Sequence, residues 1–218
     1  DLARLYLLDG RQYRSDQPCG ARGDVGPGCD ERTDPDRTML GAEQEEWLGE
    51  QLAGSRARWN VVGQQTVLTA NPLAAPGTPY NLDQWDGYPA ARRRLLDQLR
   101  EVDNPVVLSG DVHASCVCVV TDDPQDPASP PAVPELVGTS ITSEFPARWA
   151  PLVRAASEAL PTIRYLELER RGYVVCEVTP AALTASFRYV ATTAEPGAAI
   201  ETGARGGVRA GDPEPRPA

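Results

Sequence analysis

Pro105-Val106-Val107-Leu108-Ser109-Gly110-Asp111-Val112-His113-Ala114-Ser115 is the stretch of this chain that decides its fold. The apolar run 106–108 predicts a buried strand, which ends in two small residues. Polar side chains that follow such a strand lie at the carboxyl edge of a sheet, where α/β proteins bind their ligands. Asp111 and His113 are two residues apart, so in an extended segment both side chains would point to one face.

Asp111 and His113 allow two interpretations. A carboxylate oxygen and an imidazole nitrogen on one face suit a metal ion of the Zn, Fe, Mn or Ca class. For so short a motif, an Asp that only orients a His by a hydrogen bond is about as common. His113 is the single histidine of the chain and follows a buried strand, which favours a functional role.

The composition limits the classes of function. The chain has 218 residues, enough for one domain or slightly more, and its 41% hydrophobic content supports an ordinary core. A net charge of -10 argues against a non-specific nucleic-acid binder. No apolar run reaches the length of a membrane span. No signal peptide is seen, and Asp1 directly precedes an apparent core strand, so we expect further residues upstream.

The hydrophobic patterns predict alternating strands and helices, and therefore a layered α/β sheet with an antiparallel continuation. The segment from Glu195 is rich in Gly, Pro, Ala and charge, which is typical of an extended or disordered tail. We therefore expect one domain over 1–194 and a tail over 195–218. The predicted strands are 3–8, 59–67, 106–108, 115–121, 135–137, 162–168, 172–179 and 183–191, and the predicted helices are 42–53, a helix opening at Pro89, and 146–159.

Cys19 and Cys29 lie in one long loop, 15–38, that is rich in Gly, Pro and Asp. A disulfide between them is plausible if the protein is exported, because a loop of this length is often held covalently. Two free thiols or a metal-binding pair are the alternatives. Three further cysteines lie in predicted strands and are expected in the core: Cys116, Cys118 and Cys176.

Other polar residues also lie at predicted strand ends. Arg11 and Arg14 follow the first strand and could clamp a phosphate with their planar guanidinium groups. They could equally be surface or ion-pair arginines, the interpretation we prefer for Arg14. Gln64 and Gln65 either line a site or cap the edge of the sheet.

Several stretches together resemble the PhoD-like alkaline phosphatases of the calcineurin-like metallophosphoesterase superfamily. Each is weak alone, but all occur in the family's order across residues 5–178, which makes the resemblance specific. The matching stretches are Leu8-Asp9-Gly10-Arg11-Gln12-Tyr13-Arg14, Leu40-Gly41-Ala42-Glu43-Gln44-Glu45-Glu46-Trp47-Leu48, Asp83-Gln84-Trp85-Asp86-Gly87-Tyr88, Ser109-Gly110-Asp111-Val112-His113, 135–143 and Arg171-Gly172-Tyr173.

The resemblance implies a metallophosphoesterase-type α-β-β-α sandwich, of which only the C-terminal half is expected here. The family's remaining metal ligands belong to an upstream half that cannot be placed on this chain. Asp111 and His113 carry over as metal ligands, and Arg11 as a catalytic, phosphate-binding arginine. Gly10 replaces a threonine of the family, which makes the placement of Arg11 less rigid. Glu144-Phe145-Pro146 replaces the family's glycine-rich continuation, so substrate contacts from that loop are in doubt.

The function implied is a metal-dependent phosphoric ester hydrolase, an alkaline phosphatase or phosphodiesterase that uses calcium and iron on a phosphate ester substrate. The family implies a secreted or cell-envelope location. Trp85 and Tyr88 could wall the entrance of the site or belong to the core. The alternative is a catalytically inactive truncated half-domain or binding module. A serine hydrolase has little support, since no Gly-x-Ser-x-Gly occurs.

Overall fold

The computed structural model describes residues 1–20, 25–70, 80–124, 126 and 128–217. Its helices are α1 (Ala42–Ala53), α2 (Pro89–Arg100) and α3 (Ala150–Ala159), with short 3-10 turns η1 (Asp30–Thr33) and η2 (Trp85–Gly87). Its strands are β1 (Ala3–Leu7), β2 (Val25–Gly26), β3 (Trp59–Gly63), β4 (Tyr80–Asn81), β5 (Pro105–Ser109), β6 (Ser115–Thr121), β7 (Pro131–Val137), β8 (Ile163–Glu167), β9 (Gly172–Val178), β10 (Ala182–Val190), β11 (Ile200–Arg209) and β12 (Arg216–Pro217).

The main sheet has the strand order β1-β3-β5-β7-β6-β8. The pairs β1–β3, β3–β5 and β5–β7 are parallel, whereas β6 is antiparallel to both β7 and β8. The carboxyl ends of β1, β3, β5 and β7 therefore meet at one edge. Because β7 lies between β5 and β6, the turn after β5 must cross that edge. This crossing carries the Asp111–His113 pair.

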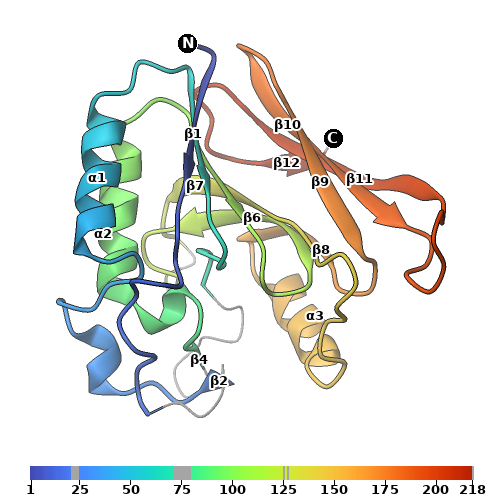
Figure 1. The fold of residues 1–218 in the computed structure, drawn as a ribbon, viewed down its shortest axis with the longest axis horizontal. Coiled ribbons are helices and arrows are strands. Elements are labelled where there is room, and N and C mark those ends of the chain that lie inside the picture. The colour runs from blue at the N-terminus through green and yellow to red at the C-terminus, as the bar shows by residue number, and fades with distance from the viewer. Residues whose placement is uncertain (21–24, 71–79, 125, 127, 218) are drawn as a thin grey trace.

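Two layers cover the two faces of the main sheet (Figure 1). Neighbouring strand residues point to opposite faces: Val62 and Val107 pack in a cluster with α1 and α2, while Val61 and Val106 pack against the second sheet. That second sheet has the order β12-β11-β10-β9. The predicted α/β sandwich is thus confirmed by the layers present.

The implied α-β-β-α sandwich, of which only the C-terminal half was expected here, has a fourth layer of helices outside the second sheet; this layer is not seen in the described part of the chain. Tyr173 and Val175 point outward from β9 and are exposed. Figure 1 shows α3 near β8, at the end of the main sheet, instead of over this outer face. The described residues therefore form an α-β-β arrangement.

The expectation of an extended or disordered tail over 195–218 is wrong for its central part. β11 pairs with β10 along nearly its whole length, and β12 pairs with β11. Gly206 and Val208 alternate inward along β11, a period-2 pattern that the Gly-rich composition hides. A Cβ at Gly207 would lie 2.5 Å from the Leu183 carbonyl oxygen, so glycine permits this close pairing.

Some predicted boundaries also differ. The strand predicted over 59–67 ends at Gly63, because the chain then leaves the sheet through Gln64 and Gln65. The helix predicted over 146–159 begins at Ala150, with a proline in its first turn. The short strand predicted at 135–137 is longer and begins at Pro131.

Cys19 and Cys29 are joined by a disulfide, with their Cα atoms 5.7 Å apart. Of the other cysteines, Cys118 is buried, whereas Cys116 and Cys176 are only partly buried. Among the helices of the described ranges, none combines the length and apolar character that crossing a membrane requires.

Candidate active site at the carboxyl edge of the main sheet

Asp111 and His113 both have left-handed backbone conformations, with φ values of 69° and 57°. The amide of Val112 donates to the Gly110 carbonyl at 2.8 Å, which closes a tight turn centred on Asp111. The premise that this segment is extended is therefore wrong. Left-handed conformations are uncommon for residues other than glycine and tend to occur at functional sites. The turn nonetheless places both side chains on the wall of one cavity.

The Asp111 carboxylate is held on both oxygens. The Arg11 guanidinium lies 2.8 Å from Oδ1, and the Gln84 side-chain amide donates to Oδ2 at 2.5 Å. Arg11 also forms an ion pair with Asp83 at 2.8 Å. The structure thus brings Arg11 and Asp111, which the sequence assigned to one site, into direct contact.

The loop that carries Arg11 is fixed by its own hydrogen bonds. The Asp9 carboxylate accepts from the backbone amides of Arg11 and Gln12 at 2.9 and 3.0 Å. These bonds, that from Gln12 foremost, hold the pKa of Asp9 below its usual value. Gln65 accepts from the Gly10 amide at 2.8 Å and donates to the Leu8 carbonyl at 2.7 Å. Gln65 therefore braces this loop despite the flexibility of a glycine at position 10.

Arg14 forms an ion pair with Asp83 at 2.7 Å, in agreement with the ion-pair interpretation of this arginine. Trp85 and Tyr88 are buried core residues, 1% and 0% exposed. The Trp85 indole donates to Gln64 at 2.8 Å, and Gln64 in turn donates to the Ser109 hydroxyl at 3.3 Å. Gln64 therefore links the buried Trp85 to Ser109, the last residue of β5.

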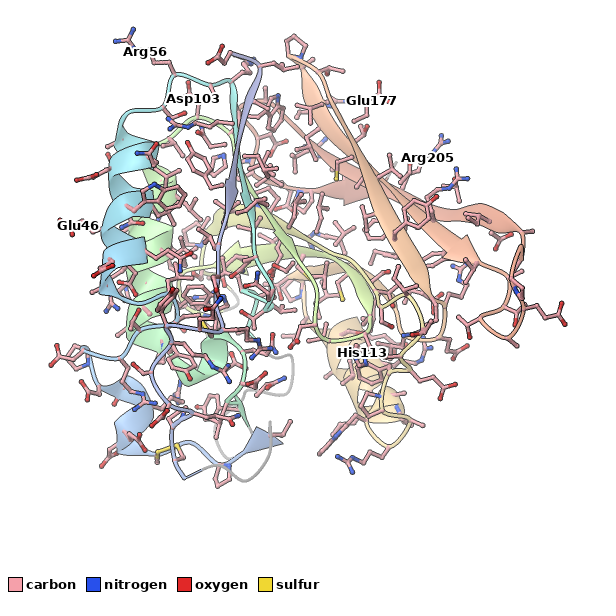
Figure 2. The ribbon with its side chains drawn as sticks, in the orientation of Figure 1. Glu46, Arg56, Asp103, His113, Glu177 and Arg205 are labelled. Atoms are coloured by element: carbon pink, nitrogen blue, oxygen red, sulfur yellow. A yellow bond between two sulfur atoms is a disulfide. The ribbon has the colours of Figure 1, made fainter. Side chains whose placement is uncertain are left out.

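His113 is oriented by a backbone carbonyl. Its Nδ1 lies 3.0 Å from the Glu144 carbonyl oxygen. A carbonyl can only accept, so Nδ1 carries the proton, and in the neutral form of the ring Nε2 then has the lone pair. This tautomer is the one that a metal-ligating histidine presents to its ion. Figure 2 shows His113 near α3, at the opposite end of the main sheet from Asp103 and Arg56.

Arg171 is a residue whose role the sequence analysis did not identify. It is 6% exposed, and it donates to the His113 carbonyl at 2.8 Å and to the Ser143 carbonyl at 2.8 Å. It therefore ties the His113 turn to the loop that supplies Glu144. Its position directly before Gly172, in one of the matched stretches, was the available signal.

Glu135 is the second residue whose role was missed. It is fully buried, and it accepts from the amides of Leu68 and Thr69 at 2.7 Å each and from the Ser109 hydroxyl at 2.5 Å. A lone acidic residue inside an apolar strand was the signal for it. Asp83 and Gln84 were likewise quoted only as part of a matched stretch, although both contact the site.

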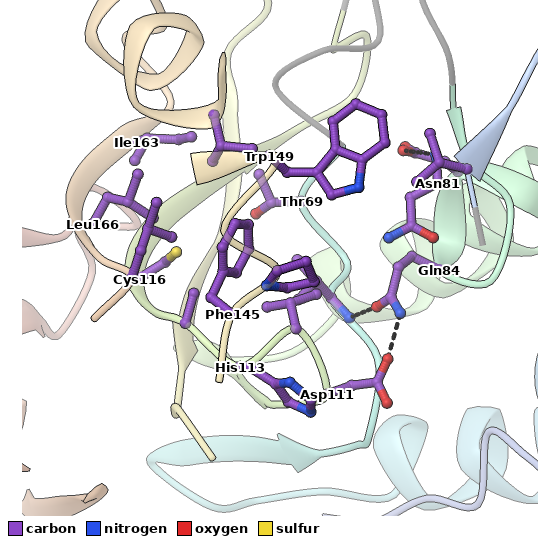
Figure 3. Close-up of a pocket in the computed structure, with 18 of the residues that line it drawn as sticks. Thr69, Asn81, Gln84, Asp111, His113, Cys116, Phe145, Trp149, Ile163 and Leu166 are labelled. Atoms are coloured by element: carbon purple, nitrogen blue, oxygen red, sulfur yellow. Dashed lines mark hydrogen bonds between the residues drawn. The ribbon is translucent and has the colours of Figure 1, made fainter. Parts of the chain in front are cut away.

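The site lies on a cavity of about 400 Å³ (Figure 3). Its polar end carries Asp83, Gln84, Asp111 and His113. The opposite wall is apolar and comes from the loop before α3, α3, β8 and the residue after β8, with these main contributors: Phe145, Trp149, Val153, Ile163, Leu166 and Leu168. Arg11, by contrast, is not among the residues that line this cavity, and it contacts the site through Asp111.

The donor set fits a metal ion in part. Asp111 supplies anionic oxygen and His113 supplies Nε2, and both face the same cavity. The residues that the structure describes contain no cluster of three or more His, Cys, Asp or Glu with metal-binding geometry. Two protein ligands alone hold a metal weakly, so a metal ion at this site would need further ligands.

We predict an acid-sensitive contribution from Asp83. Burial raises the pKa of its carboxyl, but hydrogen bonds from Arg11 and Arg14 outweigh burial, so the pKa lies below its usual 3.8. A lowered pKa stabilises the fold above the unfolded-state pKa, and this stability is lost as the pH falls through the folded-state value. In urea unfolding between pH 7 and pH 2, Asp83→Asn should lose roughly 0.5–1 kcal/mol at neutral pH and show a smaller acid-dependent loss. An unchanged pH profile would contradict this assignment, and exposed Asp103→Asn is the control.

Comparisons with known proteins identify relatives of this chain. Alkaline phosphatase D of Bacillus subtilis (strain 168) is 41% identical over 210 residues, which cover 93% of this chain and 35% of that protein. A solved structure of PhoD superposes with a TM-score of 0.84 at 37% identity, covering 99% of this chain and 42% of that chain. The chain therefore spans about a third to two fifths of the length of these relatives. The family model for PhoD-like phosphatase matches residues 1–187, and the chain belongs to the PhoD-like phosphatase family.

Proposed function

We propose that this chain provides the Asp111–His113 part of a metal-dependent phosphoric ester hydrolase, an alkaline phosphatase or phosphodiesterase. The observation that carries the proposal is the convergence of Asp111 and His113 on one cavity, with Arg11 bound to Asp111. Membership of the PhoD-like phosphatase family supports the reaction class. Phosphate esters are accordingly the proposed substrates.

Asp111 and His113 would hold a metal ion through Oδ and Nε2, with calcium and iron as the proposed metals by family resemblance. Such ions supply Lewis-acid polarisation of phosphoryl oxygens. Arg11 has five N–H donors and uses one on each of its two carboxylates, so donors remain for a phosphoryl oxygen. Its ion pairs fix the guanidinium in place, which is what stabilisation of developing charge requires.

We also propose export to an oxidising compartment. The Cys19–Cys29 disulfide supports this location, because such bonds persist outside the reducing cytosol.

The test is hydrolysis of 4-nitrophenyl phosphate and bis(4-nitrophenyl) phosphate with calcium and iron supplied. It is made on this chain and on the full product of its gene. Asp111→Asn should lower the rate and the calorimetric metal affinity at least tenfold. Substitution of a metal ligand, or of a residue that hydrogen-bonds to a ligand, commonly lowers metal affinity or activity by that factor. Asp103→Asn, exposed at the other end of the sheet, should leave both unchanged.

Two outcomes would contradict the proposal. Unchanged hydrolysis by Asp111→Asn would remove this residue from the site. Absence of hydrolysis and of metal binding in both forms of the protein would favour a non-catalytic binding module. Activity only in the longer form would support the proposal and place the missing ligands outside this chain.

A further inference from the structure

The cavity beside Asp111 has two chemically different ends. Its apolar wall, here called the apolar chamber, consists of Phe145, Trp149, Val153, Ile163 and Leu166. Figure 3 shows the Phe145 and Trp149 rings and the Ile163 and Leu166 side chains around one space, with His113 and Asp111 at its edge. Any molecule that fills the whole cavity must therefore be polar at one end and apolar at the other.

The apolar chamber is separate from the core of the protein. None of its five side chains belongs to either core cluster of buried residues, and all five remain only partly buried. Apolar side chains that line a concave surface without filling it are the usual wall of a small-molecule site. The free energy available from covering them is proportional to the apolar area removed from water.

The chamber offers few hydrogen-bonding groups to a ligand. Among its five side chains the Trp149 indole nitrogen is the one polar atom, while the Cys116 thiol, the Thr69 hydroxyl and the Arg148 guanidinium lie elsewhere on the cavity lining. A polyhydroxylated alcohol bound against these five side chains would replace few of its hydrogen bonds to water, which is costly. An aromatic or alkyl group would lose none. The Arg148 guanidinium lies 5.7 Å from the Trp149 ring centre, where a cation–π contact helps hold the indole.

We propose that the site takes phosphate esters of apolar alcohols, with the phosphoryl group at Asp111 and His113 and the alcohol part in the apolar chamber. This inference rests on the proposed function. In the reaction, water oxygen bonds to phosphorus as the bond between phosphorus and the alcohol oxygen breaks. The departing oxygen gains a proton derived from that water, and the products are the phosphate and the free alcohol.

The experiment compares calorimetric binding of three probes, 1-naphthyl phosphate, methyl phosphate and 1-naphthol, with calcium and iron present. The variants are Val153→Asp, which puts a charge into the chamber, and Leu152→Asp, its neighbour on α3, which is 49% exposed and does not line the cavity. Val153→Thr, which is nearly isosteric, keeps the test valid if the Asp variant loses its circular-dichroism signal.

The expected result is at least tenfold tighter binding of 1-naphthyl phosphate than of methyl phosphate to the wild type and to Leu152→Asp. Val153→Asp should remove most of that preference, and Val153→Thr part of it, without changing methyl phosphate affinity. Equal binding of both phosphates in all variants would overturn the inference and leave the proposed function standing. Binding of 1-naphthol as tight as that of 1-naphthyl phosphate would show that the phosphoryl group adds no affinity at Asp111 and His113. That outcome would overturn the inference because the proposed function itself had failed.

Discussion

Arg171→Met is expected to lower the free energy of unfolding by about 4 kcal/mol. The guanidinium is almost completely buried, and truncation leaves several buried acceptors without a donor, at about 1–3 kcal/mol each where no water can enter. For a chain of this size, that loss should lower the Tm by roughly 10 °C. Thermal and urea unfolding would measure it. The acceptors are the carbonyls of His113, Ser143, Leu168 and Glu169 and the hydroxyl of Ser140.

The matched control is Arg154→Met, which removes an exposed ion pair with Glu169 and should cost under about 1 kcal/mol. A second measurement separates positioning of the site from general stability. His113 is the only histidine, so its imidazole gives a single set of NMR signals. Those signals should shift in Arg171→Met and not in Arg154→Met. Equal stabilities of the two variants, or an unmoved imidazole, would contradict the role of Arg171.

The sequence predicted the parts of the fold that depend on local apolar pattern. The run at Val106 and the alternation over 172–191 became β5 and the β9–β10 hairpin. The β11 strand was missed because its inward positions include Gly206, which carries no hydrophobic signal although the pairing buries it. The segment forms a strand because it pairs in register with β10, and such pairing cannot be read from the local sequence pattern.

The sequence pointed to residue types at the end of β5, but it did not predict their backbone geometry. Arg11 contacts Asp111, and Asp111 and His113 line one cavity, but the left-handed backbone at Asp111 and His113 was expected as extended chain. The small residues before Asp111 give no information on the φ angles that Asp111 and His113 adopt. The support from Arg171 and Glu135 comes from segments distant in sequence, so no local pattern could assign their partners.

Glu135→Gln should lower the free energy of unfolding by about 3 kcal/mol, although the two side chains have the same shape. All three partners of the carboxylate are donors: the Leu68 and Thr69 amides and the Ser109 hydroxyl. An amide offers one oxygen, so its NH₂ group must face a donor and leave at least one buried N–H unpaired. Burial lowers the pKa of the nearby Arg92, and the negative charge of Glu135 counteracts this lowering. Glu135→Gln removes that charge.

Comparison with two other variants would show how this loss reaches the site. Glu177→Gln, exposed on β9, should change stability by under about 0.5 kcal/mol. Ser109→Ala removes one partner and should cost about 1 kcal/mol. Because Ser109 and Glu135 share a hydrogen bond, their double variant should show a coupling of about 0.5–3 kcal/mol in urea unfolding. Strict additivity would mean that Glu135 does not act on the end of β5, and so not on the turn that carries Asp111.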